Sequence, residues 1–364
     1  MTEADRPPLH LAVALDGAGW HPAAWREPLA RPGDLLTAGY WAGLVTEAEA
    51  GLLDFVTLED ALSLQSMHRL EPDGATDQVR GRLDAVLTAA RVAPLTRHIG
   101  LIPTVVVTHT EPFHISKAIA TLDYVSGGRA GVRVKVSSRP DEAAHFGRRA
   151  VAVTEPRDAA SRDTVSGLFD EAADYVEVIR RLWDSWQDDA EIRDAATGRF
   201  VDRGKLHYID FEGRWFSVRG PSITPRPPQG QPPVAALAHS AVPYQLVARS
   251  ADLVVFLAPD AHAAVDRKAR LDELAGHEYT SDAAVFTGTP AQLATLLQEW
   301  QQAGLSGFRL RPAGIPADLQ AITRGLVPEL QRRGVFRTSY DTGPLRGRLG
   351  LGRPASRYAA SGRS

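Results

Sequence analysis

The sequence contains no cysteine, which excludes disulfide bonds, thiolate metal ligands, iron–sulfur clusters and a cysteine nucleophile. Long apolar runs are missing too, since LVVFLA at 253–258 is far shorter than the roughly 20 residues that cross a bilayer. The first residues do not show a basic segment followed by an apolar one, so we expect no signal peptide. These absences predict a cytoplasmic protein without a membrane partner.

A strong net charge is also lacking. The 41 lysines and arginines nearly balance 44 acidic residues, which leaves a net charge of −3 and gives no reason to expect nucleic acid as a partner. Apolar residues make up 44% of the chain and charged residues 23%, as in ordinary globular proteins. A chain of 364 residues is long enough for one large α/β barrel or for two average domains.

Short apolar segments alternate with helical patterns along the chain, which is typical of repeated βα units around a parallel sheet. Strands are predicted at 9–17, 54–60, 98–107, 130–136, 233–238, 252–258 and 306–311, with a doubtful one at 282–286. This count favours one TIM (β/α)8 barrel. A doubly wound sheet is the alternative, but its first turn is usually G-x-G-x-x-G, whereas this chain has LDGAGW at 15–20.

Two segments depart from regular alternation. After a helix at about 165–186, an excursion over 187–232 contains a predicted hairpin at 205–220 and a proline-rich exit. The last residues, after Pro344, are rich in glycine, arginine and serine, and we expect a mobile extension there. The predicted organisation is therefore a single barrel domain over 1–343 and an extension over 344–364.

Four stretches resemble the bacterial-luciferase-like flavin monooxygenases, in particular the nitrilotriacetate, dibenzothiophene-sulfone and long-chain-alkane monooxygenase branch. They are GWHPAAWREP (19–28), LDFVTLED (53–60), THTEPFHISKAIATLDYVSGGRAG (108–131) and VPELQRRGVFRTSYDTGPLRGRLGLGRP (327–354). The resemblance implies a TIM barrel that binds reduced FMN from a separate flavin reductase. With O2 the flavin would form a peroxide that oxygenates a small organic substrate, and relatives are commonly homo-oligomers.

The resemblance also suggests site residues. Asp60 matches a carboxylate near the flavin at the end of the second strand, and Thr108 follows the third strand. Ser240 matches a serine that helps to hold the FMN phosphate, a role that suits a hydroxyl near a helix start. His21 matches a loop on the substrate side and is the candidate catalytic residue, and Ser137 keeps a polar family identity. A purely structural role is the alternative for these residues.

Several positions depart from the family pattern. Arg133 and Lys135 stand on the strand that would face the flavin, where they could bind its phosphate or pair with Glu59 inside the barrel. Val165 and Phe169 replace the histidine and tyrosine that reach the phosphate in relatives, so that helix face becomes apolar. The segment 259–288 is short, which predicts a shortened or irregular seventh strand.

The sequence therefore predicts an FMN-dependent monooxygenase. Two alternatives stay open: a non-catalytic paralogue or partner subunit with a degenerate flavin site, and an oxidoreductase that uses the deazaflavin F420. We expect no metal site, because the flavin carries the chemistry in this group.

Overall fold

The computed structural model describes residues 9–66, 73–149, 159–236 and 250–359. The chain divides into two compact units. The first unit is made of Met1–Asp60, Gly74–Pro103 and Ala235–Thr342, and the second of Ala61–Asp73, Thr104–Val234 and Gly343–Ser364. The single domain predicted over 1–343 stays a prediction.

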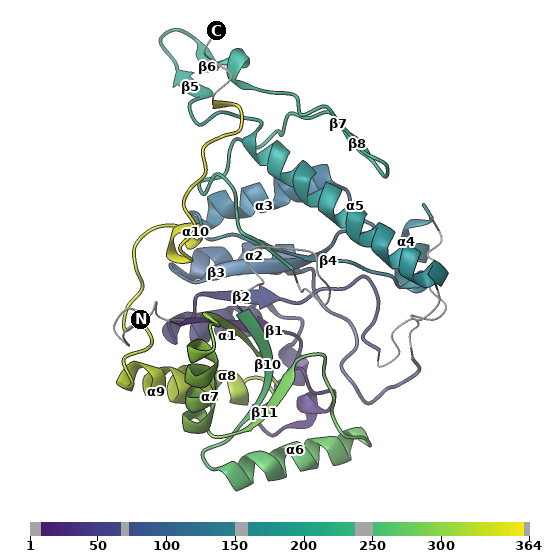
Figure 1. Ribbon diagram of the computed structural model, residues 1–364, viewed down its shortest axis with the longest axis vertical. Coiled ribbons are helices and arrows are strands. Elements are labelled where there is room, and N and C mark those ends of the chain that lie inside the picture. The colour runs from purple at the N-terminus through teal and green to yellow at the C-terminus, as the bar shows by residue number, and fades with distance from the viewer. Residues whose placement is uncertain (1–8, 67–72, 150–158, 237–249, 360–364) are drawn as a thin grey trace. The chain divides into compact units, whose positions relative to one another are not determined.

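A parallel sheet forms the centre of the first unit (Figure 1). Its strands are β1 (His10–Leu15), β2 (Phe55–Leu58), β10 (Ser250–Leu257), β11 (Ala284–Gly288) and β12 (Gly307–Pro312). They lie in the order β11-β10-β12-β1-β2, and the first residues of β3 (Gly100–Val106) pair with β2. Because parallel strands are covered on both faces, short and nearly continuous apolar runs form them. The doubtful strand at 282–286 is formed as β11.

The longer helices of the first unit begin at polar caps, which are threonine or aspartate. The helices of this unit are α1 (Ala38–Ala50), α2 (Ala85–Val92), α6 (Ala261–Ala275), α7 (Pro290–Gln302), α8 (Ala317–Ala321) and α9 (Val327–Arg332), with short turns η2 (Ala24–Arg26), η3 (Pro32–Asp34), η4 (Ala93–Leu95) and η6 (Ile322–Leu326). Thr289 caps α7 in a capping box with Gln292, and Pro290 takes the first helical position. A hydroxyl that accepts from a free backbone N–H stabilises a helix end in this way.

Helix α6 lies on the charged face of this sheet. Val254 of β10 pairs in register with Arg311 of β12, so the two side chains share a face. Leu271 of α6 packs against Val254 and Phe256 on that face. On the opposite face, Trp300 of α7 packs near Phe308 of β12. Helices therefore cover both faces here, whereas a regular barrel keeps its helices outside.

The order of β10 and β11 explains the position of α6. In a regular barrel β11 would lie between β10 and β12, but here β10 pairs with β12 on one edge and with β11 on the other. The connection from β10 to β11 therefore runs in the opposite direction to the connection from β1 to β2. Since crossovers between parallel strands are right-handed, reversing the direction moves the helix to the other face. The predicted irregularity of the seventh-strand region takes this form, with β11 at the edge of the sheet beside β10.

The second unit contains the last residues of β3, which pair in parallel with β4 (Val132–Lys135). Its middle segment ends at Val234, the first residue of β9 (Val234–Ala236), which follows β4 in the strand order. Helices α3 (Pro112–Ser126) and α5 (Ala159–Asp184) lie side by side (Figure 1). The other elements are α4 (Pro140–Phe146), α10 (Leu345–Arg348), η5 (Arg203–Lys205) and the short strands β5 (Glu191–Asp194), β6 (Arg199–Val201), β7 (Phe211–Glu212) and β8 (Ser217–Val218). The predicted hairpin of the excursion is formed by β7 and β8.

The predicted extension after Pro344 is packed over most of its length. Leu345 is fully buried, and its backbone N–H donates to the carbonyl oxygen of Gly128 at 2.9 Å. Farther along, Arg353 forms an ion pair with Asp188. The structure thus describes residues 344–359 as part of the second unit rather than as the mobile tail expected from composition. Among the described helices, none is long and apolar enough to cross a membrane.

Candidate functional site

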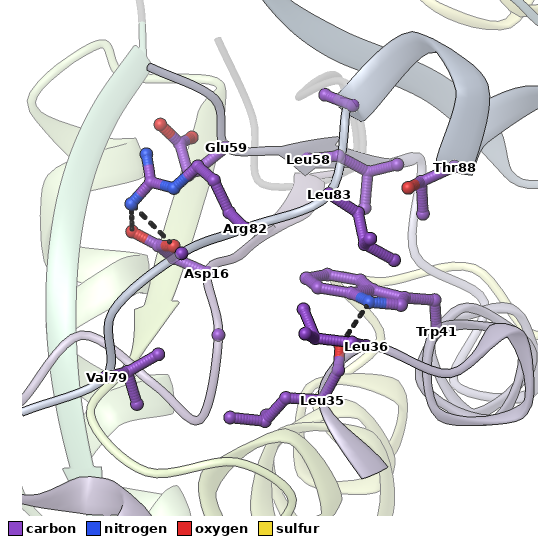
Figure 2. A pocket seen from close by; sticks show the side chains of 13 residues that line it. Asp16, Leu35, Leu36, Trp41, Leu58, Glu59, Val79, Arg82, Leu83 and Thr88 are labelled. Atoms are coloured by element: carbon purple, nitrogen blue, oxygen red, sulfur yellow. Dashed lines mark hydrogen bonds and ion pairs between the residues drawn. The ribbon is translucent and has the colours of Figure 1, made fainter. Parts of the chain in front are cut away.

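A pocket opens in the first unit where β1 and β2 end, at the edge of the sheet where α/β proteins bind ligands. Figure 2 shows its two ends: leucine side chains and the indole of Trp41 at one, Asp16, Glu59 and Arg82 at the other. One terminal nitrogen of Arg82 lies 3.2 and 3.3 Å from the two carboxylate oxygens of Asp16. Sequence reasoning did not find this pocket, because 66 residues separate the paired side chains.

A chain of buried charges begins at Glu59 and follows the same face of the sheet. Arg309 donates to Glu59 at 2.9 Å and to Asp252 at 2.7 Å. Arg311 donates to Asp252 at 2.6 Å and to Asp282 at 2.6 Å. Burial alone would raise the pKa of Asp252, but the two arginines hold it below its ordinary value. The face is therefore charged but internally paired.

Glu59 was predicted to neutralise Arg133 and Lys135. In the first unit Glu59 has Arg309 as its ion-pair partner. Its predicted contact with the two cations, which belong to the second unit, stays a prediction. Arg309 was not singled out from the sequence, although the alternation of arginine with apolar residues in GFRLRP (307–312) is the signal that could have found it.

His21, the candidate catalytic residue, is held by its surroundings in the first unit. Its Nδ1 accepts from the backbone N–H of Ala23 at 3.1 Å, so Nε2 carries the proton and donates to Asp272 at 3.1 Å. Burial lowers the pKa of His21, although Asp272 opposes this effect. The neutral ring is 2% exposed, and both of its nitrogens form hydrogen bonds within the protein. This geometry favours a positioning role, and the catalytic role stays untested.

The loop that carries His21 depends on a glycine. Gly19 has φ of +130°, and a Cβ there would lie 2.3 Å from the carbonyl oxygen of Ala313. This close approach lets the N–H groups of Trp20 and His21 donate to the carbonyls of Pro312 and Ala313. The loop after β1 is therefore hydrogen-bonded to the end of β12.

Asp60 directly follows Glu59 and lies at the start of α2. Its Oδ2 accepts from the backbone N–H of Ala85, the first residue of that helix, at 2.9 Å. The structure thus gives Asp60 the helix-start contact that the alternative interpretation expected. A further contact with a flavin stays a prediction.

Two predicted residues of the second unit meet at the ends of β3 and β4. The hydroxyl of Thr108 accepts from the backbone N–H of Ser137 at 2.8 Å, and the Ser137 hydroxyl accepts from that of Arg139 at 3.2 Å. Arg133 is buried and donates to the hydroxyl of Thr104 at 2.9 Å, while Lys135 is half-buried. Ser240 lies outside the described residues.

Two further polar groups gather in the same part of the second unit. His109 is 6% exposed and its ring stacks on Phe146 of α4 at 5.3 Å. Glu142 lies one helical turn before Phe146 and therefore shares that face of α4. Among the described residues, His109 Nε2 and Glu142 Oε2 have no hydrogen-bond partner. Their place after β3 and at the start of α4 could have suggested them from the sequence.

The helix face predicted to be apolar is apolar where the structure describes it. Val165 packs with Leu168 against Ala143, and Val136 joins this cluster. Phe169 is half-buried. Within the described ranges, no group of three or more histidine, aspartate or glutamate side chains is placed to hold a metal ion.

Comparison with known proteins gives a consistent result. Residues 22–294 match the family model described as luciferase-like monooxygenase. The chain is 28% identical to N-acetyl-S-(2-succino)cysteine monooxygenase of Bacillus subtilis (strain 168), with 96% of this chain and 98% of that protein covered. It is 27% identical to component A of nitrilotriacetate monooxygenase from Aminobacter aminovorans, with 96% and 98% covered.

Solved structures show the same fold. The crystal structure of a long-chain alkane monooxygenase superposes with a TM-score of 0.80 at 20% identity, covering 96% of each chain. An EDTA monooxygenase from Chelativorans sp. BNC1 gives 0.79 at 21% identity, with 95% of this chain and 99% of that chain covered. The predicted α/β fold of TIM-barrel type is thereby confirmed. The first curated alignment runs over 452 positions against the 364 residues of this chain, so the relative carries segments that this chain lacks.

Proposed function

Since the chain belongs to the luciferase-like monooxygenases, as its sequence predicted, we propose that it oxygenates a small organic substrate with reduced FMN and O2. A separate flavin reductase would supply the reduced FMN. The observation that carries the proposal is the similarity over nearly the whole chain to proteins named as monooxygenases, one of them a component A. In such a reaction the reduced flavin supplies two electrons, one oxygen atom enters the substrate, and the other leaves as water.

The donor set of the second unit suits a polar cofactor. His109 and Glu142 each keep one buried polar atom without a hydrogen-bond partner among the described residues, and a buried unpaired atom costs about 1–3 kcal/mol. A flavin has hydrogen-bonding groups along its ring and chain that could satisfy such atoms. Thr108, Ser137, Arg133 and Lys135 would add hydroxyl groups and positive charge. These residues would bind and orient the cofactor.

The apolar cluster around Val165 favours a second candidate function. A phosphate gains nothing from valine and phenylalanine, so the helix face that holds it in relatives would not do so here. A non-catalytic paralogue or partner subunit would explain this. The F420 alternative is supported by a similarity of fold alone, with a tetrahydromethanopterin reductase described as F420-dependent, at a TM-score of 0.53.

Turnover separates the candidates. The full-length protein is combined with a flavin reductase, NADH, FMN and isotope-labelled O2, and neutral and carboxylated organic compounds are offered in parallel. One labelled oxygen atom in a product, dependent on this protein, is the expected result. Labelled product with reduced F420 in place of FMN would reassign the cofactor. Absence of product together with absence of flavin binding would leave the paralogue.

A further inference from the structure

The pocket of the first unit has a wall that offers no hydrogen bonds. Leu35, Leu36, Leu58, Leu83 and Trp41 line one end (Figure 2). The indole N–H of Trp41 already donates to the carbonyl oxygen of Leu35 at 2.9 Å, so the ring presents only its carbon surface. An apolar group gains about 25 cal/mol for each Å² that it buries against such a wall. This end therefore suits a hydrocarbon or aromatic body.

The other end holds charges that are already balanced. Arg82 is paired with Asp16 through one terminal nitrogen, and Glu59 is paired with Arg309 at 2.9 Å. A carboxylate entering here would meet two carboxylates, and its approach to Arg82 would compete with Asp16. Like charges at close range disfavour such a ligand. The pocket therefore disfavours anions.

One donor at this end remains unused. The Nε of Arg82 is buried and has no hydrogen-bond partner among the described residues. A neutral oxygen, as in a ketone, ether or sulfone, could accept from it without disturbing the pair with Asp16. A buried donor that gains a partner typically contributes about 1 kcal/mol or more.

We propose that this pocket binds a neutral, mainly apolar substrate, whose single acceptor oxygen takes a hydrogen bond from Arg82. That the ligand is a substrate rests on the proposed function; that it is neutral and apolar rests on the pocket. The substrate class thus differs from the polycarboxylates that name some relatives, such as nitrilotriacetate.

Two ligands of nearly the same shape test the role of Arg82. Acetophenone has a carbonyl oxygen where α-methylstyrene has a methylene carbon. We expect the full-length protein to bind acetophenone roughly tenfold more tightly, because one hydrogen bond to a charged group is worth about 1.4 kcal/mol or more. Isothermal titration calorimetry without flavin measures both dissociation constants. Nitrilotriacetate is expected not to bind at the concentrations that saturate acetophenone.

The variant Arg82→Met should bring the two dissociation constants together, because it removes the donor and keeps an apolar stem. Arg91→Met is the matched control: Arg91 is an exposed arginine of α2 that does not line the pocket, and its loss should leave the tenfold ratio unchanged. Val79→Trp, which fills the pocket, should weaken both neutral ligands together. Thermal unfolding of each variant shows that the fold is kept.

Several results would overturn the proposal. They are no binding of either neutral ligand, an unchanged ratio of the two dissociation constants in Arg82→Met, the same affinity for the neutral ligands in Val79→Trp as in the wild type, or tighter binding of nitrilotriacetate than of acetophenone. Binding of reduced FMN to the same protein is measured in a separate titration. If the neutral ligands bind through Arg82 but the protein does not bind reduced FMN, the result would support the pocket and refute the proposed function. Flavin binding without neutral-ligand binding would refute the pocket alone.

Discussion

At the scale of single residues, Arg309 joins the buried charges of the first unit. It is 8% exposed and forms ion pairs with both Glu59 and Asp252. Buried charges are tolerated only when each has a partner, because removing one member leaves the others uncompensated. The stability of this face therefore depends on Arg309.

We predict that Arg309→Met destabilises the protein by about 3 kcal/mol, because it removes the arginine that pairs with buried Glu59 and one of the two arginines that pair with Asp252. Urea unfolding measures the loss. The triple variant with Glu59→Gln and Asp252→Asn in addition should recover most of it, whereas Arg91→Met on the exposed face of α2 should change stability by less than about 0.5 kcal/mol. An unchanged free energy of unfolding in Arg309→Met would contradict the stabilising role of this charge network.

His21 predicts a pH dependence. Its pKa is lowered in the folded protein by burial, so the unfolded chain takes up a proton first as the pH falls. The stabilising contribution is complete above the unfolded pKa of about 6.5 and is lost as the pH falls towards the folded pKa. The titratable groups that act on the ring are Asp272, His277 and Lys268, and the rings of Phe256 and Tyr279 pack against it.

We predict that His21→Asn, which keeps an acceptor for the N–H of Ala23, loses less stability than the wild type between pH 6.5 and pH 5. The difference in slope is at most about 1.4 kcal/mol per pH unit, the value for one proton. Urea unfolding at a series of pH values measures it. Parallel curves for the two proteins would show that His21 is protonated equally in both states.

His109 gives a prediction that separates function from structure. Its buried Nε2 has no hydrogen-bond partner among the described residues, so replacing it with an apolar side chain removes an unfavourable group. We predict that His109→Leu keeps or raises the free energy of unfolding while oxygenation with reduced FMN falls. His145→Leu, an exposed position on α4, is the control. Loss of stability without loss of activity would indicate a structural histidine.

At the scale of elements, α6 depends on its contact with the charged face of the sheet. Leu271 is fully buried against Val254 and Phe256, whereas Val265 on the same helix is 56% exposed. We predict that Leu271→Ala costs about 3 kcal/mol, since it leaves a cavity in a packed layer. Val265→Ala should cost less than about 0.5 kcal/mol. Equal and small effects in urea unfolding would show that α6 does not pack there.

The elements themselves could be predicted from the sequence, but not all of their neighbours. Apolar runs located every strand of the main sheet, including the doubtful one that forms β11, because strand formation follows local composition. The place of β10 beside β12 depends on contacts such as that of Asp252 with Arg309, which lie 57 residues apart. No local pattern reports such a pairing.

In the candidate site, too, some contacts could be predicted from the sequence and others could not. The contact of Thr108 with Ser137 joins two residues that the resemblance had already suggested. Arg82 and Asp16 belong to none of the recognised motifs, and only the fold brings them together at one pocket. The packing of the segment after Pro344 was also missed, because its glycine and arginine content resembles that of a tail, although Leu345 is fully buried.

At the scale of the whole molecule, the chain combines the fold of a monooxygenase family with an apolar helix face around Val165. Family membership favours flavin chemistry, and within the described ranges His109 and Glu142 each keep one buried polar atom without a hydrogen-bond partner. The apolar helix face at Val165 argues for a changed phosphate site. Both features bear on one question, which is whether the protein binds reduced FMN.

The most direct test is an anaerobic titration of the full-length protein with reduced FMN, followed by the change in flavin fluorescence or by calorimetry. We predict saturable binding at one site per chain, with a dissociation constant in the micromolar range. Ser137→Ala should weaken it, and His145→Leu should not. The absence of binding at millimolar reduced FMN would contradict the assignment of this chain as a flavin-dependent monooxygenase.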